Sequence, residues 1–296
     1  MVGRETNTVT EDDVLAVFTN REIQEDEDVQ ILRKEIHLDV DQHFIDFLNR
    51  KPDPSSLAFW KDQIIERQQL SSDDDALINT STAFFLSTEL FEIGYLVYRM
   101  YKAAYGDAVG KSTFNGAHQL AVPIIRLTEF LPAVQKIGQG VVVGKGDWKT
   151  QLASNKYQFE EEFAEEFVSR SRFTFAHPTS MSLVDALNTN AGSPLSEARR
   201  NQLVSDLSIG VKTRAQALLA VAEDQNLVSA EFNRAFVLMQ YFGYLRRDPN
   251  DTPDGDFTGY EFWLRKLDQL SGNYVGVEMV KAFITSDEYR KRFDAS

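Results

Sequence analysis

The strongest candidate for binding chemistry is a polar loop near the C-terminus, residues 250–261 (NDTPDGDFTGYE). Its spacing fits a calcium-binding loop, in which oxygen ligands alternate with spacer residues around a glycine at the sharp turn. With Gly255 at that turn, six residues fall at ligand positions: Asn250, Thr252, Asp254, Asp256 through its carbonyl oxygen, Thr258 and Glu261. Oxygen ligands followed by a helix suit Ca²⁺. The spacing therefore predicts a calcium site.

Two features of the same loop favour another interpretation. Asn250 stands at the first position, where Asp is usual, and Pro253 restricts the backbone. The alternative is a polar turn stiffened by Pro253 and Gly255, with no metal. The sequence leaves both interpretations open.

Residues typical of other active sites are missing from the sequence or are wrongly spaced. The absence of cysteine excludes disulfides, thiolate metal sites and cysteine nucleophiles. The four histidines have no metal-ligand spacing, and no Gly-x-Ser-x-Gly motif offers a serine nucleophile. The glycine-rich segment 138–146 lacks the Ser or Thr that follows the lysine of a phosphate-binding loop. We therefore expect no enzyme; a hydrolase with a site built from distant carboxylates is the least favoured alternative.

Composition and charge indicate a folded protein that avoids anionic partners. The chain has 296 residues, of which 43% are apolar, so a sizeable core is available. Its net charge of −14 repels nucleic acid and anionic lipid. No apolar run reaches the roughly 18 residues that span a bilayer, and the N-terminus has no signal-peptide pattern. We expect a protein partner or self-association, no nucleic acid and no membrane insertion.

Helical spacing of apolar residues dominates the chain and predicts a mostly α fold with little β structure. Residues 1–36 are polar and acidic and are expected to form an arm, whereas residues 37–296 are expected to form a single helical domain. The longest core helix is predicted over 76–105 and ends at Gly106. Glycines around three valines predict a loop or short hairpin near 138–146.

An internal repeat divides the helical domain. Segment 50–60 (RKPDPSSLAFW) recurs, with an insert, as 247–263, and segment 83–89 (AFFLSTE) recurs as 282–288 (AFITSDE). The shared order of landmarks predicts two related halves, 37–110 and 228–296, joined by a middle helical section, 111–227. One such unit leaves its apolar side exposed, so we expect the halves to pack on each other or around the middle section.

The repeat landmarks also carry a family resemblance. The string 46–60 (DFLNRKPDPSSLAFW) with 83–87 (AFFLS) resembles the bacterial "domain of unknown function 4214" family, and residues 236–293 resemble the same module again. The span from about 38 to 293 resembles its long, acidobacterial-type version. The module is also similar to the helical linker domain of phycobilisome linker proteins, which is a scaffold. Family members often carry two cysteines in the connector that corresponds to 68–75, where this chain has none.

The resemblance implies a function and a location. It implies a non-catalytic helical scaffold or protein-interaction module, structural or self-assembling. It also implies an extracellular or cell-surface location, because such modules commonly end large secreted polypeptides; a cytoplasmic location is the alternative. The alternative function is a calcium-dependent surface or carbohydrate-binding module that uses the loop around Asp254.

Overall fold

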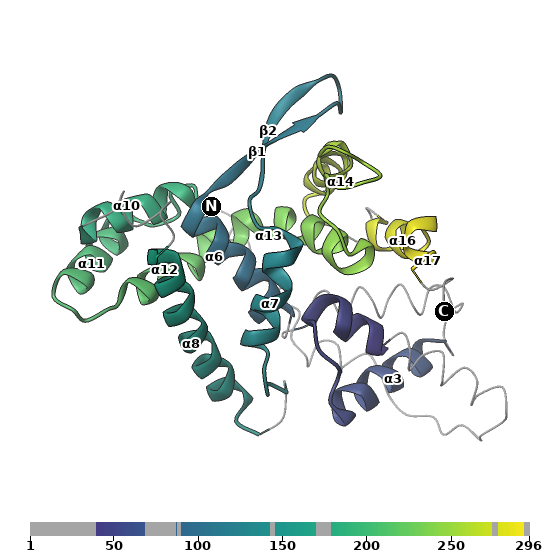
Figure 1. Cartoon of the computed structure of the whole chain (residues 1–296), viewed down its shortest axis with the longest axis horizontal. Coiled ribbons are helices and arrows are strands. Elements are labelled where there is room, and N and C mark those ends of the chain that lie inside the picture. Colours follow the sequence, from purple (N-terminus) through teal and green to yellow (C-terminus); the bar gives the residue numbers. More distant parts are fainter. Residues whose placement is uncertain are drawn as a thin grey trace, which may run out of the picture.

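The computed structural model describes residues 40–68, 87, 90–142, 146–169, 179–273 and 278–292. These residues form a mostly helical fold with one two-stranded antiparallel sheet, as the sequence predicts (Figure 1). Within them, no helix combines the length and the apolar character needed to cross a membrane. The acidic arm predicted at 1–36 lies outside the described residues.

Two buried helical segments form the centre of the molecule (Figure 1). They consist of the π-helical turn η1 (Phe91–Tyr95) with α6 (Leu96–Tyr105), and of α13 (Gln225–Gln240) with the π-helical turn η2 (Tyr241–Leu245). Their aromatic residues meet in the core, where the rings of Tyr95 and Phe232 stack with centroids 5.5 Å apart. The first segment ends at Gly106, whose φ of 75° suits glycine. The predicted end of this helix is therefore confirmed; residues 76–86, 88 and 89 lie outside the described residues.

Further helices surround the central pair. They include α7 (Leu127–Ile137), α8 (Trp148–Ser169), α10 (Ser180–Asn190), α11 (Glu197–Ser208) and α12 (Arg214–Ala222). The last three lie together at one end of the molecule (Figure 1). Helices α10 to α13 each follow a residue whose side-chain oxygen accepts a backbone N–H bond, namely Thr179, Ser196, Thr213 and Asp224.

The hairpin lies at 107–123, whereas segment 138–146 was predicted to form a loop or short hairpin and is a loop where it is described. Strand β1 (Asp107–Ser112) pairs with β2 (His118–Pro123), with Ser112 opposite His118. The described part of 138–146 forms turns and connections without a strand. Asn115 and Gly116 in the connection have φ of 57° and 105°, a conformation that this residue pair tolerates. The hairpin projects beyond the surrounding helices (Figure 1).

The two predicted halves contribute the remaining helices. These are a helix over 40–48, α3 (Pro54–Gln68), α14 (Thr258–Gln269), α16 (Met279–Ile284) and α17 (Asp287–Arg290). The ring of Phe47 covers Gly243 so closely that a Cβ on this glycine would lie 1.5 Å from Phe47 Cε1. Asp46, which is 2% exposed, accepts hydrogen bonds from Arg292 at 2.7 and 3.0 Å. The helix that opens the first half thus packs on the second half.

The Pro-bearing turns of the two halves share their backbone geometry. Asn49 and Arg246 both adopt a left-handed conformation, with φ of 51° and 54°. The next residue in each turn, Arg50 or Arg247, donates its backbone N–H to the carbonyl six residues earlier at 3.4 Å. Its guanidinium also lies over the aromatic ring of that earlier residue, 4.9 and 5.4 Å from the centroid. These correspondences agree with the predicted repeat, which stays a prediction; residues 69–86, which include part of its first copy, lie outside the described residues.

Candidate functional site

A buried ionic cluster fixes the base of the hairpin to the two central helices. Lys102 on α6 lies 2.7 Å from a carboxylate oxygen of Asp107, the first residue of β1, and 3.6 Å from Glu231 on α13. Arg234 on α13 lies 2.9 Å from Asp107 and 3.4 Å from Glu231. Two cations therefore share two carboxylates, and this pairing offsets the cost of removing four charges from water.

Tyrosine side chains complete this cluster. The hydroxyl of Tyr98 donates to Glu231 at 2.5 Å, and that of Tyr260 donates to the backbone carbonyl of Arg234 at 3.2 Å. Burial, followed by the negative charge of Glu231, raises the pKa of Tyr98 well above 10. Burial also raises the pKa of Tyr260. Both hydroxyls thus keep their protons at neutral pH and act as donors, which is a structural role.

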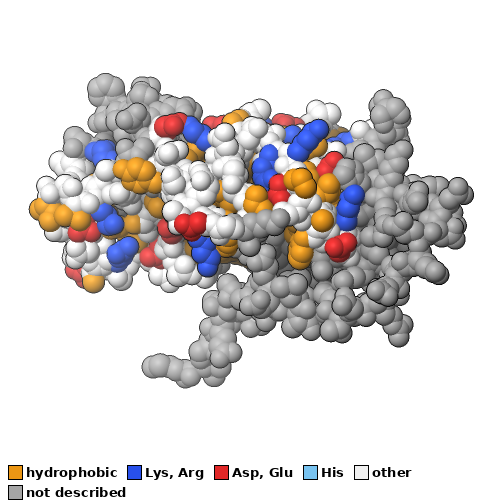
Figure 2. Space-filling model, turned by 90° about the horizontal axis from the view of Figure 1, so that it is seen from below, with side chains coloured by type: hydrophobic (Ala, Val, Ile, Leu, Met, Phe, Trp, Pro, Cys, Tyr) orange, Lys and Arg blue, Asp and Glu red, His pale blue; other side chains and the backbone are white. Residues whose placement is uncertain are grey.

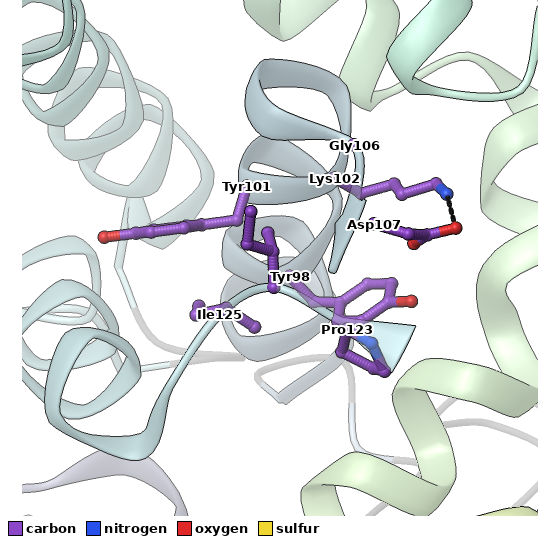
Figure 3. A pocket seen from close by; sticks show the side chains of 8 residues that line it. Tyr98, Tyr101, Lys102, Gly106, Asp107, Pro123 and Ile125 are labelled. Atoms are coloured by element: carbon purple, nitrogen blue, oxygen red, sulfur yellow. Dashed lines mark ion pairs between the residues drawn. The ribbon is translucent and has the colours of Figure 1, made fainter. Parts of the chain in front are cut away.

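A depression beside the cluster is too narrow to hold a water molecule. Tyr98, Tyr101 and Lys102 of α6 line it together with Asp107 and the end of β2 at Pro123 (Figure 3). The ammonium group of Lys102 points to Asp107 in this view. A catalytic site needs space for a substrate next to its acid, base or nucleophile. The geometry therefore favours an anchor for the hairpin over an active site.

Helix α14 holds the other end of the hairpin. The backbone N–H of Phe257 donates to the carbonyl of Lys111 at 2.8 Å, and the N–H of Thr113 donates to Thr258 Oγ1 at 2.8 Å. The ring of Phe257 covers Gly110, because a Cβ there would lie 2.7 Å from its Cδ2 atom. These contacts attach the second half of β1 to the start of α14.

A histidine–carboxylate contact attaches β2 to the same helix. His118 Nε2 lies 3.0 and 3.2 Å from the two carboxylate oxygens of Glu261, and Nδ1 lies 2.8 Å from the carbonyl oxygen of Gly116. The hydrogen bond to Gly116, followed by the bond and charge of Glu261, raises the pKa of His118. Glu261, whose side chain is 4% exposed, also pairs with Arg265 at 2.6 Å.

The six predicted calcium ligands contact different protein groups, and their described contacts do not gather them around one position. Arg126 donates to Asn250 at 2.7 Å, and Arg247 lies 2.7 Å from Asp254. The remaining contacts also stay within the protein. Asp256 accepts the backbone N–H of Thr258 at 2.8 Å, and the hydroxyl oxygen of Thr258 accepts the backbone N–H of Thr113. Glu261 pairs with His118 and Arg265. Thr252 precedes Pro253 through a cis peptide bond.

Arginine fixes this loop against the start of α7. Arg126 Nε lies 3.0 Å from Asp248, which also accepts the backbone N–H of Leu127 at 3.1 Å. In the described part of the chain, no three His, Asp or Glu side chains form a group that could hold a metal ion. The calcium site stays a prediction, and calorimetry with Ca²⁺ on the intact chain and on Asp254→Ala tests it.

Glu92 and His43 have ordinary structural roles. Glu92 accepts a hydrogen bond from Lys156 at 2.6 Å. His43 is buried with its ring 5.9 Å from that of Phe47. His37 and His177 lie outside the described residues.

Sequence reasoning missed the hairpin and its anchor. The dipeptide Asn115-Gly116 is a strong hairpin signal, and it could have located the turn. The anchor gives no comparable signal, because Lys102 and Asp107 meet Glu231 and Arg234 more than a hundred residues further along the chain.

Comparison of the chain with protein-family models, curated proteins and solved structures finds no match. The resemblance to the family of unknown function and to the linker domain therefore stays a prediction. The cell-surface location that it implies stays a prediction as well. What the described residues define is a mostly helical protein with one firmly anchored hairpin.

Proposed function

We propose that the chain is a non-catalytic helical scaffold module that presents its hairpin to a protein, either a second copy of itself or another partner. The observation that carries the proposal is the exposed outer face of the hairpin. Val109 on this face is 74% exposed, and its neighbours Lys111, Gln119 and Ala121 are also exposed. Val109 pairs with Ala121 across the hairpin, so two apolar side chains lie next to each other in solvent on this face.

The anchor at the base of the hairpin supports this proposal. The four paired charges of the ionic cluster, two of them buried and two partly buried, and the bonds to Phe257 and Thr258 hold the hairpin in one orientation. A surface that is already ordered loses little conformational entropy when it binds. The narrow depression beside the cluster has no room for a substrate, so at this place the described residues form an anchor for the hairpin.

Exposed apolar residues at the α10–α12 end of the chain provide a control for substitutions of Val109. Met181, Ile209 and Val211 belong to the α10–α12 end of the chain and are 55%, 70% and 66% exposed. Figure 2 shows hydrophobic side chains on the surface at that end. Ile209 matches Val109 in exposure but lies on a loop between helices, away from the hairpin.

Light scattering coupled to size-exclusion chromatography tests the self-association form of the proposal. The wild-type mass is expected to rise above 33.7 kDa as the concentration increases. Val109→Glu should return the mass to that of the monomer, whereas Ile209→Glu should leave it unchanged. A wild-type chain that stays monomeric up to its solubility limit would contradict this form, as would equal effects of the two substitutions.

A further inference from the structure

The hairpin has two outer edges, and the start of α14 covers one of them. The backbone carbonyl of Lys111 on β1 accepts the N–H of Phe257 at 2.8 Å, and the N–H of Thr113 donates to Thr258 Oγ1 at 2.8 Å. Covering a strand edge in this way keeps other chains from pairing with it. The edge of β2 lies on the opposite side of the two-stranded sheet, away from these contacts.

The pairing register shows which backbone groups the β2 edge presents. Opposite residues of antiparallel strands alternate between pairs that bond each other and pairs whose N–H and C=O groups point outward. Lys111 bonds outward, so its pair with Gln119 is of the outward kind, and so is the pair that contains Ala121. The contact of the Arg234 guanidinium with the carbonyl of Ala121 at 3.4 Å agrees with this assignment. Gln119 and Ala121 therefore direct their backbone groups away from β1.

These outward groups are open to a further strand. Within the described ranges of the chain, no other group bonds the N–H of Gln119 or Ala121, and both residues are exposed. The carbonyl of Ala121 accepts Arg234 but has a second lone pair. Pro123 ends the strand without an N–H group, so pairing stops there. The hairpin also projects beyond the surrounding helices (Figure 1).

We propose that the β2 edge pairs with the β2 edge of a second copy of this chain, antiparallel and with Leu120 at the two-fold axis. In this register Gln119 lies opposite Ala121 of the second copy, and the two residues exchange both backbone hydrogen bonds. Symmetry repeats the exchange on the other side of the axis. A shift by two residues would bring Pro123, or Ala117 in the connection, into a bonding position, so fewer bonds form.

Charge and length favour a second copy as the occupant of this edge. Two copies with a net charge of −14 repel each other, but residues 108–123 contain one lysine and no acidic residue. Asp107 at the base is paired with Lys102 and Arg234. Two hairpins therefore approach with little repulsion. A longer partner strand would run past Pro123 without gaining bonds there, whereas a second β2 has the matching length. This inference rests on the proposed function and names its partner.

Disulfide trapping tests the inference, because the chain has no cysteine of its own. Gln119→Cys and Ala121→Cys are prepared as separate intact chains, and oxidised glutathione is added to each alone and to their mixture. Opposite residues of a bonded pair have Cα atoms about 5.5 Å apart, within reach of a disulfide. Diagonal neighbours, such as the two copies of residue 119, lie about 7 to 8 Å apart and are beyond that reach.

The mixture is therefore expected to give several-fold more cross-linked dimer than either variant alone. Equal yields in the three samples, or no dimer in the mixture, would overturn the inference.

Proline substitutions test the backbone bonds themselves. Gln119→Pro removes an outward N–H and leaves the bonds within the hairpin intact, so the mass from light scattering should fall to that of one chain. Lys111→Pro makes the same change on the covered edge and should leave the mass unchanged. Equal effects of the two substitutions would contradict the assignment to β2. Circular dichroism checks that both variants keep their helices, and the trapping result decides if one does not.

Failure of this inference can be told apart from failure of the proposed function. If Val109→Glu abolishes self-association but the mixed cysteine variants give no dimer, the proposed function is retained and the inference is overturned. If the mixture gives the dimer but the mass does not respond to Val109→Glu, the β2 pairing is supported and the outer face of the hairpin is not the binding surface.

Discussion

Replacing Asp46 by asparagine should destabilise the whole fold, because this residue joins the first described helix to the last. Its carboxylate is 3% exposed and receives two hydrogen bonds from Arg292, at 2.7 and 3.0 Å, and one from Gln42 at 2.7 Å. Arg246 Nε lies 3.8 Å from the same carboxylate. Asp46→Asn keeps the shape of the side chain and removes its charge, so two arginines lose their shared counter-ion.

The expected cost follows from the burial of the three groups. Removing one partner of a buried ion pair costs about 3 to 5 kcal/mol. The side chains of Arg246 and Arg292 are 26% and 20% exposed, so water recovers part of their solvation and the lower end applies. A loss of about 3 kcal/mol lowers the folding equilibrium constant roughly a hundredfold.

Urea denaturation followed by circular dichroism measures this loss. The midpoint of Asp46→Asn should fall while the slope of the transition stays unchanged, since the substitution does not alter the surface exposed on unfolding. The control is Asp185→Asn, which breaks a pair with Arg200 whose side chains are 43% and 27% exposed. A surface pair of this kind contributes less than about 1 kcal/mol. Equal losses in both variants would refute the reasoning.

Three other predictions concern packing, capping and titration. Gly243→Ala should cost about 3 kcal/mol in thermal unfolding, because its Cβ would overlap the ring of Phe47. Asp53→Ala should lower the free energy of unfolding in urea by about 1 kcal/mol, since the carboxylate caps α3. Burial raises the pKa of Asp53, but the hydrogen bonds from Ser55 and Ser56 outweigh it and lower the pKa to about 2. The stabilisation by the cap is therefore complete above pH 3.8 and disappears as the pH falls through 2. NMR titration should give His118 a pKa above 6.5, and this pKa should fall in Glu261→Gln. The stabilisation from the contact between His118 and Glu261 is complete below pH 6.5 and disappears as the pH rises through the raised pKa.

Each of these predictions has its own control. Gly94→Ala should cost less than Gly243→Ala, because the nearest atom to its Cβ is the flexible Cδ1 of Leu90 at 2.8 Å. The difference in stability between wild type and Asp53→Ala should vanish in strong acid. Arg265→Gln should shift the pKa of His118 upward, opposite to Glu261→Gln, because it removes a nearby positive charge. Shifts of the same sign would contradict the assigned contacts.

The sequence predicted those parts of the fold that depend on local signals. The spacing of apolar residues and the glycine at 106 located a core helix and its end. The hairpin escaped prediction because β1 has little apolar alternation: Gly110 and Lys111 stand where a strand usually has larger apolar residues. It is held by contacts from far along the chain, among them Phe257, which packs on Gly110 and bonds to Lys111.

The candidate site shows the same division between local and distant information. The oxygen-rich spacing of 250–261 was visible in the sequence, but its contact with Arg126 was not. Arg126 reaches Asn250 from the start of α7, and its distance in sequence is 124 residues. Such pairs form only when the tertiary structure brings separate helices together, so a single sequence carries no signal for them.

Photo-cross-linking from position 109 tests whether the anchored hairpin is the binding element of a non-catalytic scaffold. A photoreactive amino acid replaces Val109 in one sample and Ile209 in another, and the cross-linked peptides are identified by mass spectrometry. We expect protein cross-links from position 109, to a second copy or a partner, and few from position 209. Equal yields from both positions, or none from position 109, would contradict it.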